Sequence, residues 1–249
     1  MRSGKFGFLG SFSAGGSSGG TDFNSYVDSL LPLMRWKLEQ ASGVTEPDAS
    51  GNGYNGTLSG TTFAAEGISV PAVVGYSGLS RGYKFPDTGQ VIASQSSYAL
   101  ALGASTSSEW TICIFLAGSP GSNQYLLNRG NSAALIYQYV TDTVEFFRTR
   151  GSGVNPRDSS GIPLGGDDTD TPHMIVYRYN NGQWSGFKDG AVVFDVSAVF
   201  SLSGSPSQWF LAESSGGSAH SPAKMWEVQL YDRALSNAEI ADMWSYRDV

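Results

Sequence analysis

The sequence of 249 residues has one cysteine, two histidines and few charged side chains. Because Cys113 is the only cysteine, no internal disulfide can form. Acidic residues outnumber basic ones, 22 to 15, and the formal charge of -7 argues against a nucleic-acid backbone as partner. The chain also lacks a basic cluster that would hold an anionic lipid surface. No apolar run approaches the roughly 18 residues of a membrane-spanning helix.

The motifs of several common enzyme sites are missing as well. The sequence has no nucleophile elbow, no metal-binding histidine spacing, no phosphate-binding glycine loop and no dinucleotide-binding glycine motif. Glu109, Glu145 and Glu227 each stand alone among apolar or aromatic neighbours. Binding and structural roles therefore come before catalysis.

Glycine, serine and aromatic residues are abundant instead, with 32 glycines and 12% aromatic side chains. This composition is typical of many short strands joined by tight turns, and the length suits one large β domain. Residues 109–116 (EWTICIFL) predict the central strand, because Trp110 and Ile112 lie on one face and Cys113 and Phe115 on the other. We expect Cys113 to be a buried free thiol.

Further strands alternate with recognisable turns. Apolar runs predict strands at 125–128, 134–139 and 143–148. A second series at 173–179, 184–188 and 191–196 is separated by Asn-Gly and Asp-Gly turns, which are strong hairpin signals. The long irregular segment 151–172 is one place for a binding rim.

Both ends of this β region have their own patterns. Residues 26–33 have helical spacing that Pro32 would end, and a first strand begins at Met34. Near the C-terminus, Trp226, Val228 and Leu230 alternate on one face of a strand. A short closing helix should follow, because Ser236 and Glu239 have capping-box spacing and Ile240, Met243 and Trp244 form one apolar stripe.

Three segments follow one family pattern in order: residues 34–58 (MRWKLEQASGVTEPDASGNGYNGTL), 173–193 (HMIVYRYNNGQWSGFKDGAVV) and 227–240 (EVQLYDRALSNAEI). Together they resemble the concanavalin A-like, laminin G-like jelly-roll domains. The resemblance implies an all-β sandwich of two antiparallel sheets, with the first strand beside the last and a short C-terminal helix. Residues 82–94 look like a hairpin of the family, and His173 occupies a structural position.

The loop 47–57 (PDASGNGYNGT) offers oxygen ligands on a permissive backbone, which suits calcium. Asp48 and Asn52 are the candidate ligands. In the resembling domains an acidic residue before the last strand assists, and here Glu227 is the nearest, one position away. The alternative is a polar turn whose Asx side chains bond their own backbone.

The first 25 residues do not fit the jelly-roll pattern. Phe6, Phe8, Leu9 and Phe12 form an apolar cluster before a Gly/Ser-rich linker, and interruption by glycine and serine argues against a secretory signal. We expect residues 1–25 to be an extended docking arm and 26–249 to be the jelly-roll domain. A disordered tail and an arm folded on its own domain are the alternatives.

For function, the arm and the compact acidic domain resemble the organisation of tailed-bacteriophage virion proteins. We therefore expect a non-enzymatic virion structural protein, such as a capsid decoration protein, head fibre, or neck or tail component. Its partners would be virion proteins or copies of itself, and its domain would bind host-surface glycans weakly. A secreted or cell-surface carbohydrate-binding module is the alternative. The paired ExDxE carboxylates of the resembling glucanases are missing, so a glycoside hydrolase ranks below both.

Aromatic side chains that could stack on a sugar are Tyr54, Trp184 and Trp209.

Overall fold

The computed structural model describes twelve segments of the chain: residues 22–39, 43–59, 83–84, 91–94, 109–117, 124–128, 135–139, 143–147, 161–164, 172–197, 210–211 and 224–246. The arm residues Phe6, Phe8, Leu9 and Phe12, and the candidate Trp209, lie outside these segments. The docking arm therefore stays a prediction.

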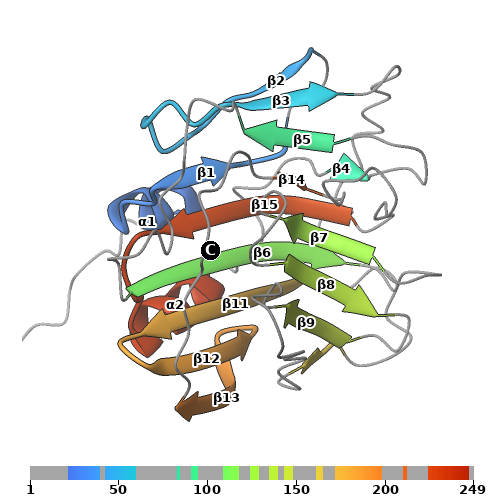
Figure 1. Cartoon of the computed structure of the whole chain (residues 1–249). Coiled ribbons are helices and arrows are strands. Elements are labelled where there is room, and N and C mark those ends of the chain that lie inside the picture. Colours follow the sequence, from blue (N-terminus) through green and yellow to red (C-terminus); the bar gives the residue numbers. More distant parts are fainter. Residues whose placement is uncertain are drawn as a thin grey trace, which may run out of the picture.

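The described strands form two antiparallel sheets, as expected from the sequence (Figure 1). The seven-stranded sheet has the order β1 (Met34–Trp36), β15 (Lys224–Tyr231), β6 (Glu109–Ala117), β11 (His173–Asn180), β12 (Gln183–Lys188) and β13 (Ala191–Ser197), and β4 (Tyr83–Lys84) also pairs with β15. The eight-stranded sheet has the order β10 (Ile162–Pro163), β9 (Thr143–Phe147), β8 (Leu135–Tyr139), β7 (Gln124–Asn128), β14 (Phe210–Leu211), β5 (Val91–Ser94), β3 (Gly56–Ser59) and β2 (Thr45–Glu46).

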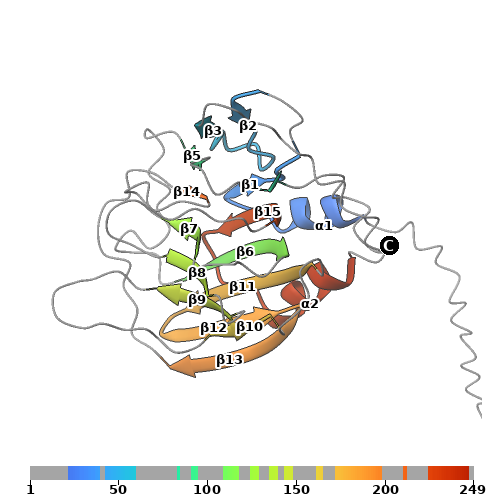
Figure 2. The ribbon, with the colours of Figure 1, turned by 90° about the vertical axis from the view of Figure 1, so that its right-hand side faces the viewer.

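Helices add a third layer on the outer face of the seven-stranded sheet. The second view shows α1 (Phe23–Ser29) and α2 (Asn237–Ser245) on one side of this sheet and the eight-stranded sheet on the other (Figure 2). One hydrophobic cluster, which includes Trp110 and Ile175, fills the space between the sheets. A second cluster, which includes Phe115 and Ile240, lies under the helices. The central strands β6, β11 and β15 of the seven-stranded sheet are therefore buried on both faces.

Strand β6 confirms its predicted central place, between β15 and β11. Trp110, Ile112, Ile114 and Leu116 belong to the cluster between the sheets, whereas Cys113 and Phe115 face the helices. Burial raises the pKa of the Cys113 thiol strongly, so the thiol is protonated and inert at neutral pH.

The predicted face of Trp226 is wrong. The β15–β6 register shifts between Met225 and Glu227, which places an extra residue in β15. Met225 therefore points between the sheets with Val228 and Leu230, while Trp226 joins the cluster under the helices. A β-bulge changes which face the residues on one side of it point toward. The sequence has no glycine at this position that would have indicated a bulge.

The first helix begins three residues earlier than predicted. Asp22 caps it by accepting a hydrogen bond from the backbone N–H of Ser25 at 2.8 Å. The helix ends before Leu31, whose φ of +56° leaves the helical region. Phe23 is fully buried in the cluster under the helices. The predicted boundary at residues 25 and 26 therefore falls inside a helix that packs on the domain.

The C-terminal region matches its pattern closely. Strand β1 pairs with β15, which brings the two ends of the domain together. Helix α2 begins after Ser236 with the expected capping box, and Ile240 and Met243 are fully buried. Residues 82–94, however, do not form one hairpin, because β4 pairs with β15 and β5 belongs to the other sheet.

Candidate functional site

The predicted calcium ligands already have protein partners. Both carboxylate oxygens of Asp48 are occupied: the backbone N–H groups of Arg35, Ser50 and Tyr54 and the Ser50 hydroxyl donate to them at 2.8 to 3.0 Å. The Asn52 side-chain amide donates to the carbonyl oxygen of Leu33 at 3.0 Å. The Ser50 N–H bond to Asp48 is an Asx turn of the kind offered as the alternative, whereas the Arg35 and Leu33 bonds tie the loop to distant residues.

Glu227 is fully buried and is bound to the Arg35 guanidinium. Its two oxygens accept hydrogen bonds from Nε of Arg35 at 2.7 Å and from Nη2 at 3.3 Å. Asp28 and Asn24 of α1 accept from the rest of the same guanidinium. Burial alone would lower the pKa of Arg35, but the neighbouring Glu227 and Asp28 carboxylates raise it on balance. Arg35 therefore fastens α1 to the sheet, with Glu227 as its buried counter-charge, and calcium binding stays a prediction.

The structure removes Trp184 from the residues that could stack on a sugar. Its side chain is only 1% exposed and its ring stacks on Tyr177 at 5.4 Å between centroids. Tyr54 is half-buried beside the cluster between the sheets, and its carbonyl oxygen accepts a hydrogen bond from the Trp36 indole. Tyr54 keeps some exposure, but Trp184 is a core residue.

A group of polar side chains that sequence reasoning missed lies on the outer face of β12 and β13. We call Gln183, Ser185, Asp195 and Ser197 the polar strip. The β12–β13 register pairs Gln183 with Ser197 and Ser185 with Asp195, so alternation puts all four on one face. The Asp-Gly turn was not a sufficient signal for this pairing, because the β12–β13 register shifts by one residue between Gly186 and Phe187.

Asp195 is the centre of the polar strip. Its Oδ1 atom accepts hydrogen bonds from Ser185 Oγ at 2.7 Å and from Gln183 Nε2 at 2.9 Å. These bonds, from Ser185 first and Gln183 second, lower the pKa of the exposed Asp195 carboxyl below its usual value. Its Oδ2 atom accepts no hydrogen bond from the described part of the chain. The carboxylate is thus ionised and held in place, with one oxygen open to solvent.

Arg178 supports the strip from below. Its Nη2 atom donates to Ser185 Oγ at 3.0 Å, and Nη1 donates to the Leu235 carbonyl and to Asn237 at the start of α2. The guanidinium also lies 4.8 Å above the centre of the Phe187 ring. Burial lowers its pKa, an effect that the Asp195 charge partly offsets. The contacts with Leu235 and Asn237 place the strip beside the N-terminal end of α2.

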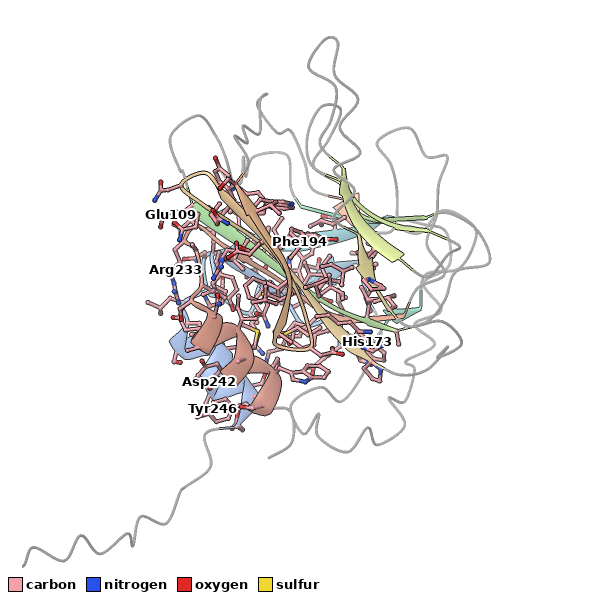
Figure 3. All side chains as sticks on the ribbon, turned by 90° about the horizontal axis from the view of Figure 1, so that it is seen from below. Glu109, His173, Phe194, Arg233, Asp242 and Tyr246 are labelled. Carbon is pink, nitrogen blue, oxygen red and sulfur yellow. The ribbon has the colours of Figure 1, made fainter. Side chains whose placement is uncertain are left out.

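Next to the polar strip, the ends of β6 and β11 carry the side chains of Glu109, Asn180 and Asn181. Asn180 pairs with both Gln183 and Glu109 in the sheet, and Asn181 Nδ2 donates to Glu109 Oε1 at 2.5 Å. Seen from below, Glu109 and Arg233 lie near one end of the helix pair, and Asp242 and Tyr246 near the other (Figure 3). The ends of β6, β11 and β12 next to the polar strip therefore carry both hydrogen-bond donors and hydrogen-bond acceptors.

His173 has the structural place that the family pattern implied. Its Nδ1 atom lies 2.8 Å from Asp189 Oδ2, and the other Asp189 oxygen accepts from the backbone N–H of Met174. The pair closes the turn at Asp189, which has a φ of +52°. Within the described segments, no three His, Cys, Asp or Glu side chains are grouped to hold a metal ion.

Solved structures share this fold. The binding domain of botulinum neurotoxin DC in complex with SialylT matches with a TM-score of 0.59 and 9% identity, over 87% of this chain and 51% of that chain. A botulinum neurotoxin type C structure, whose cell entry depends on two ganglioside molecules, matches with a TM-score of 0.60 and 9% identity, over 90% and 52%. Trypanosoma rangeli sialidase in complex with sialic acid matches with a TM-score of 0.58 and 15% identity, over 88% and 33%.

These similarities establish a jelly-roll-like all-β fold. No protein-family model matches the chain, and a comparison with curated proteins finds no match. The chain spans about half the length of the neurotoxin chains and a third of the sialidase chain. Among the described residues, no helix is long and apolar enough to cross a membrane.

Proposed function

We propose that this chain is a non-enzymatic carbohydrate-binding module, and that the polar strip is its sugar site. The observation that carries the proposal is the Asp195 carboxylate, which Ser185 and Gln183 hold through one oxygen while the other faces solvent. Sugar hydroxyls donate and accept hydrogen bonds at once, so an ionised acceptor beside amide and hydroxyl donors suits a pair of neighbouring hydroxyls.

The apolar side of a sugar also needs a contact, and β13 supplies one. Val192 pairs with Phe187 of the cluster under the helices, so it lies on the same outer face as Asp195, and it is 46% exposed. The structures that share the fold support this class of ligand, since the neurotoxins interact with SialylT or gangliosides and the sialidase is in complex with sialic acid. Fold alone does not determine function, so the proposal rests on the strip.

Binding is favoured over hydrolysis by the state of Asp195. A glycosidase needs one carboxyl group with a raised pKa to protonate the leaving oxygen. The Ser185 and Gln183 hydrogen bonds lower the pKa of Asp195 instead, which stabilises the ionised acceptor. We therefore expect this strip to bind a sugar without cleaving it.

The setting predicted from the sequence, a virion protein that displays its domain to host glycans, stays a prediction. So does the alternative of a secreted or cell-surface module. A glycan-binding domain serves either setting, and the virion partners await their own test.

Binding is tested with an array of sialylated and neutral oligosaccharides, followed by calorimetry on the best ligand. Asp195→Asn should weaken binding about 10- to 100-fold, because a hydrogen bond to a charged group contributes about 1.5–3 kcal/mol. The matched control is Asp242→Asn, an exposed carboxylate of α2 whose charge acts on Tyr26 of α1 and not on the strip.

Two outcomes would overturn the proposal. One is that the array shows no binding to any glycan. The other is that Asp195→Asn and Asp242→Asn change the affinity equally, since the strip would then have no special part in it.

A further inference from the structure

Among the described strands, β13 is an open edge of the seven-stranded sheet. It ends the strand order, and its side chains are almost all exposed. Val192, Val193 and Val196 are 46%, 41% and 45% exposed, which makes them three of the five large apolar side chains exposed in the described part of the chain. An exposed edge strand presents unpaired backbone N–H and C=O groups as well, so it favours pairing with another strand.

The opposite edge of the same sheet is covered. Trp36 of β1 forms a bridge with Asp48, and the backbone N–H of Ala49 donates to the Arg35 carbonyl at 2.8 Å. The Asp48 carboxylate accepts from the Arg35 N–H in addition. The loop around Asp48 therefore satisfies the β1 edge from within the chain.

Both edges of the eight-stranded sheet are short. Strand β2 has two residues, and β10 has two residues of which one is Pro163. A short strand or a proline gives a partner little to pair with. Of the four edges formed by described strands, β13 alone is both long, with seven residues, and free of proline.

Asp195, the one charged residue of β13, does not protect this edge against pairing with another strand. Ser185 and Gln183 of β12 hold the Asp195 carboxylate over the outer face of the sheet. Lysine, the residue that most often protects an edge, is missing from the strand. A bulge interrupts the β12–β13 register between Gly186 and Phe187, so the regular part of the edge runs from Phe194 to Ser197.

We propose that two copies of this chain pair through β13 and join their seven-stranded sheets into one. A two-fold axis perpendicular to the sheet makes the two strands antiparallel. When Val196 of one copy lies opposite Val196 of the other copy, Asp195 of each copy lies opposite Ser197 of the other. Because Ser197 is uncharged, no like charges then meet across the pair. A second copy thus complements the edge in hydrogen bonding, apolar contact and charge.

The pairing is tested by sedimentation of the full chain from about 1 to about 100 µM, a range that suits a small interface of modest affinity. The mass should rise from 26.4 kDa toward twice that value. Val196→Lys should keep the chain monomeric, because two ammonium groups would face each other across the axis. Val44→Lys is the matched control, since Val44 is 67% exposed in a loop off this edge, and it should sediment like the wild type.

A cysteine variant tests the register. Cα atoms directly opposite in antiparallel strands lie about 4.5–5.5 Å apart, within the about 4.4–6.8 Å of disulfides. Val196→Cys should therefore oxidise to a covalent dimer, while Val44→Cys should not. The native Cys113 is fully buried and does not compete. A monomeric wild type at every concentration, a dimer that survives Val196→Lys, or equal crosslinking of both cysteine variants would overturn the proposal.

Discussion

The buried ion pair between Arg35 and Glu227 positions the guanidinium that holds α1 to the sheet. Five hydrogen bonds leave the Arg35 guanidinium, two to Glu227, two to Asn24 and one to Asp28. Both side chains of the ion pair are 0% exposed. We expect Glu227→Gln to destabilise the fold by about 3–5 kcal/mol, because it removes the buried counter-charge and leaves the buried cation with only the exposed Asp28 carboxylate.

Asp28 makes the comparison quantitative, because it binds the same guanidinium at the same 2.7 Å. Its side chain is 59% exposed, so water screens the pair and Asp28→Asn should cost only about 0.2–1 kcal/mol. At about 2–4 °C per kcal/mol for a chain of this size, Tm should fall by about 6–20 °C for Glu227→Gln and by less than about 4 °C for Asp28→Asn.

Urea denaturation followed by circular dichroism provides the free energies, and calorimetry provides Tm. Arg35→Lys is a further control, since it keeps the charge but offers three donors in place of five. It should be destabilising even though both carboxylates retain a cation. Equal losses for Glu227→Gln and Asp28→Asn would show that burial does not set the strength of this network, and the reasoning would fail.

Two further predictions concern the capping box and the Asp48 loop. Glu239→Gln should cost about 0.2–1 kcal/mol at pH 7, because glutamine can still accept the capping hydrogen bond but loses the charge that pairs with Arg233. The Arg233 hydrogen bond chiefly lowers the pKa of Glu239 below 4.5, so its contribution is present above pH 4.5 and lost as the pH falls through the lowered pKa. Urea titrations at pH 7 and pH 3 check whether the difference shrinks. For the Asp48 loop, we expect EDTA to leave Tm unchanged, because four N–H and O–H donors already fill the Asp48 carboxylate. A calorimetric scan in which EDTA lowers Tm and calcium restores it would instead establish the calcium site.

The features predicted correctly from the sequence are those that local patterns determine. Strand β6 shows two apolar faces over nine residues, and the turn at Gly182 fixes the register of the β11–β12 hairpin. Ser236 and Glu239 cap α2 within one turn of each other. In each case the residues that make the contact are neighbours in the sequence or in one strand, so their spacing carries the information.

The missed features depend on contacts between distant segments. Arg35 and Glu227 lie on β1 and β15 at positions that alternate with core residues, and such positions normally face water. They became a buried pair because α1 covers that face, which strand periodicity does not reveal. The Trp226 bulge likewise depends on how β15 meets β6. For the candidate site, Asp195 was overlooked because its importance comes from side chains 10 and 12 residues away.

Helix coverage also decides where a ligand could reach the seven-stranded sheet. α1 lies over β1 and β15 through Arg35, and α2 lies over β11 and β12 through Arg178 and the Gly190 turn. The Gln183, Asp195 and Ser197 side chains remain in contact with solvent beside α2. A sugar site on this outer face is therefore expected beside α2, where the strip lies.

The glycan site and the β13 pairing share a strand, yet they can be separated by experiment. Val196 lies on the opposite face from Asp195, so Val196→Lys should leave the calorimetric affinity for a soluble monovalent glycan unchanged. It should weaken binding to a surface coated with many glycans, because two linked sites gain avidity that one site lacks. Asp195→Asn should weaken both kinds of binding. If Val196→Lys abolished monovalent binding while the fold stayed intact, the sugar would have to contact the dimer edge itself, and the site would belong to the pair rather than to each copy.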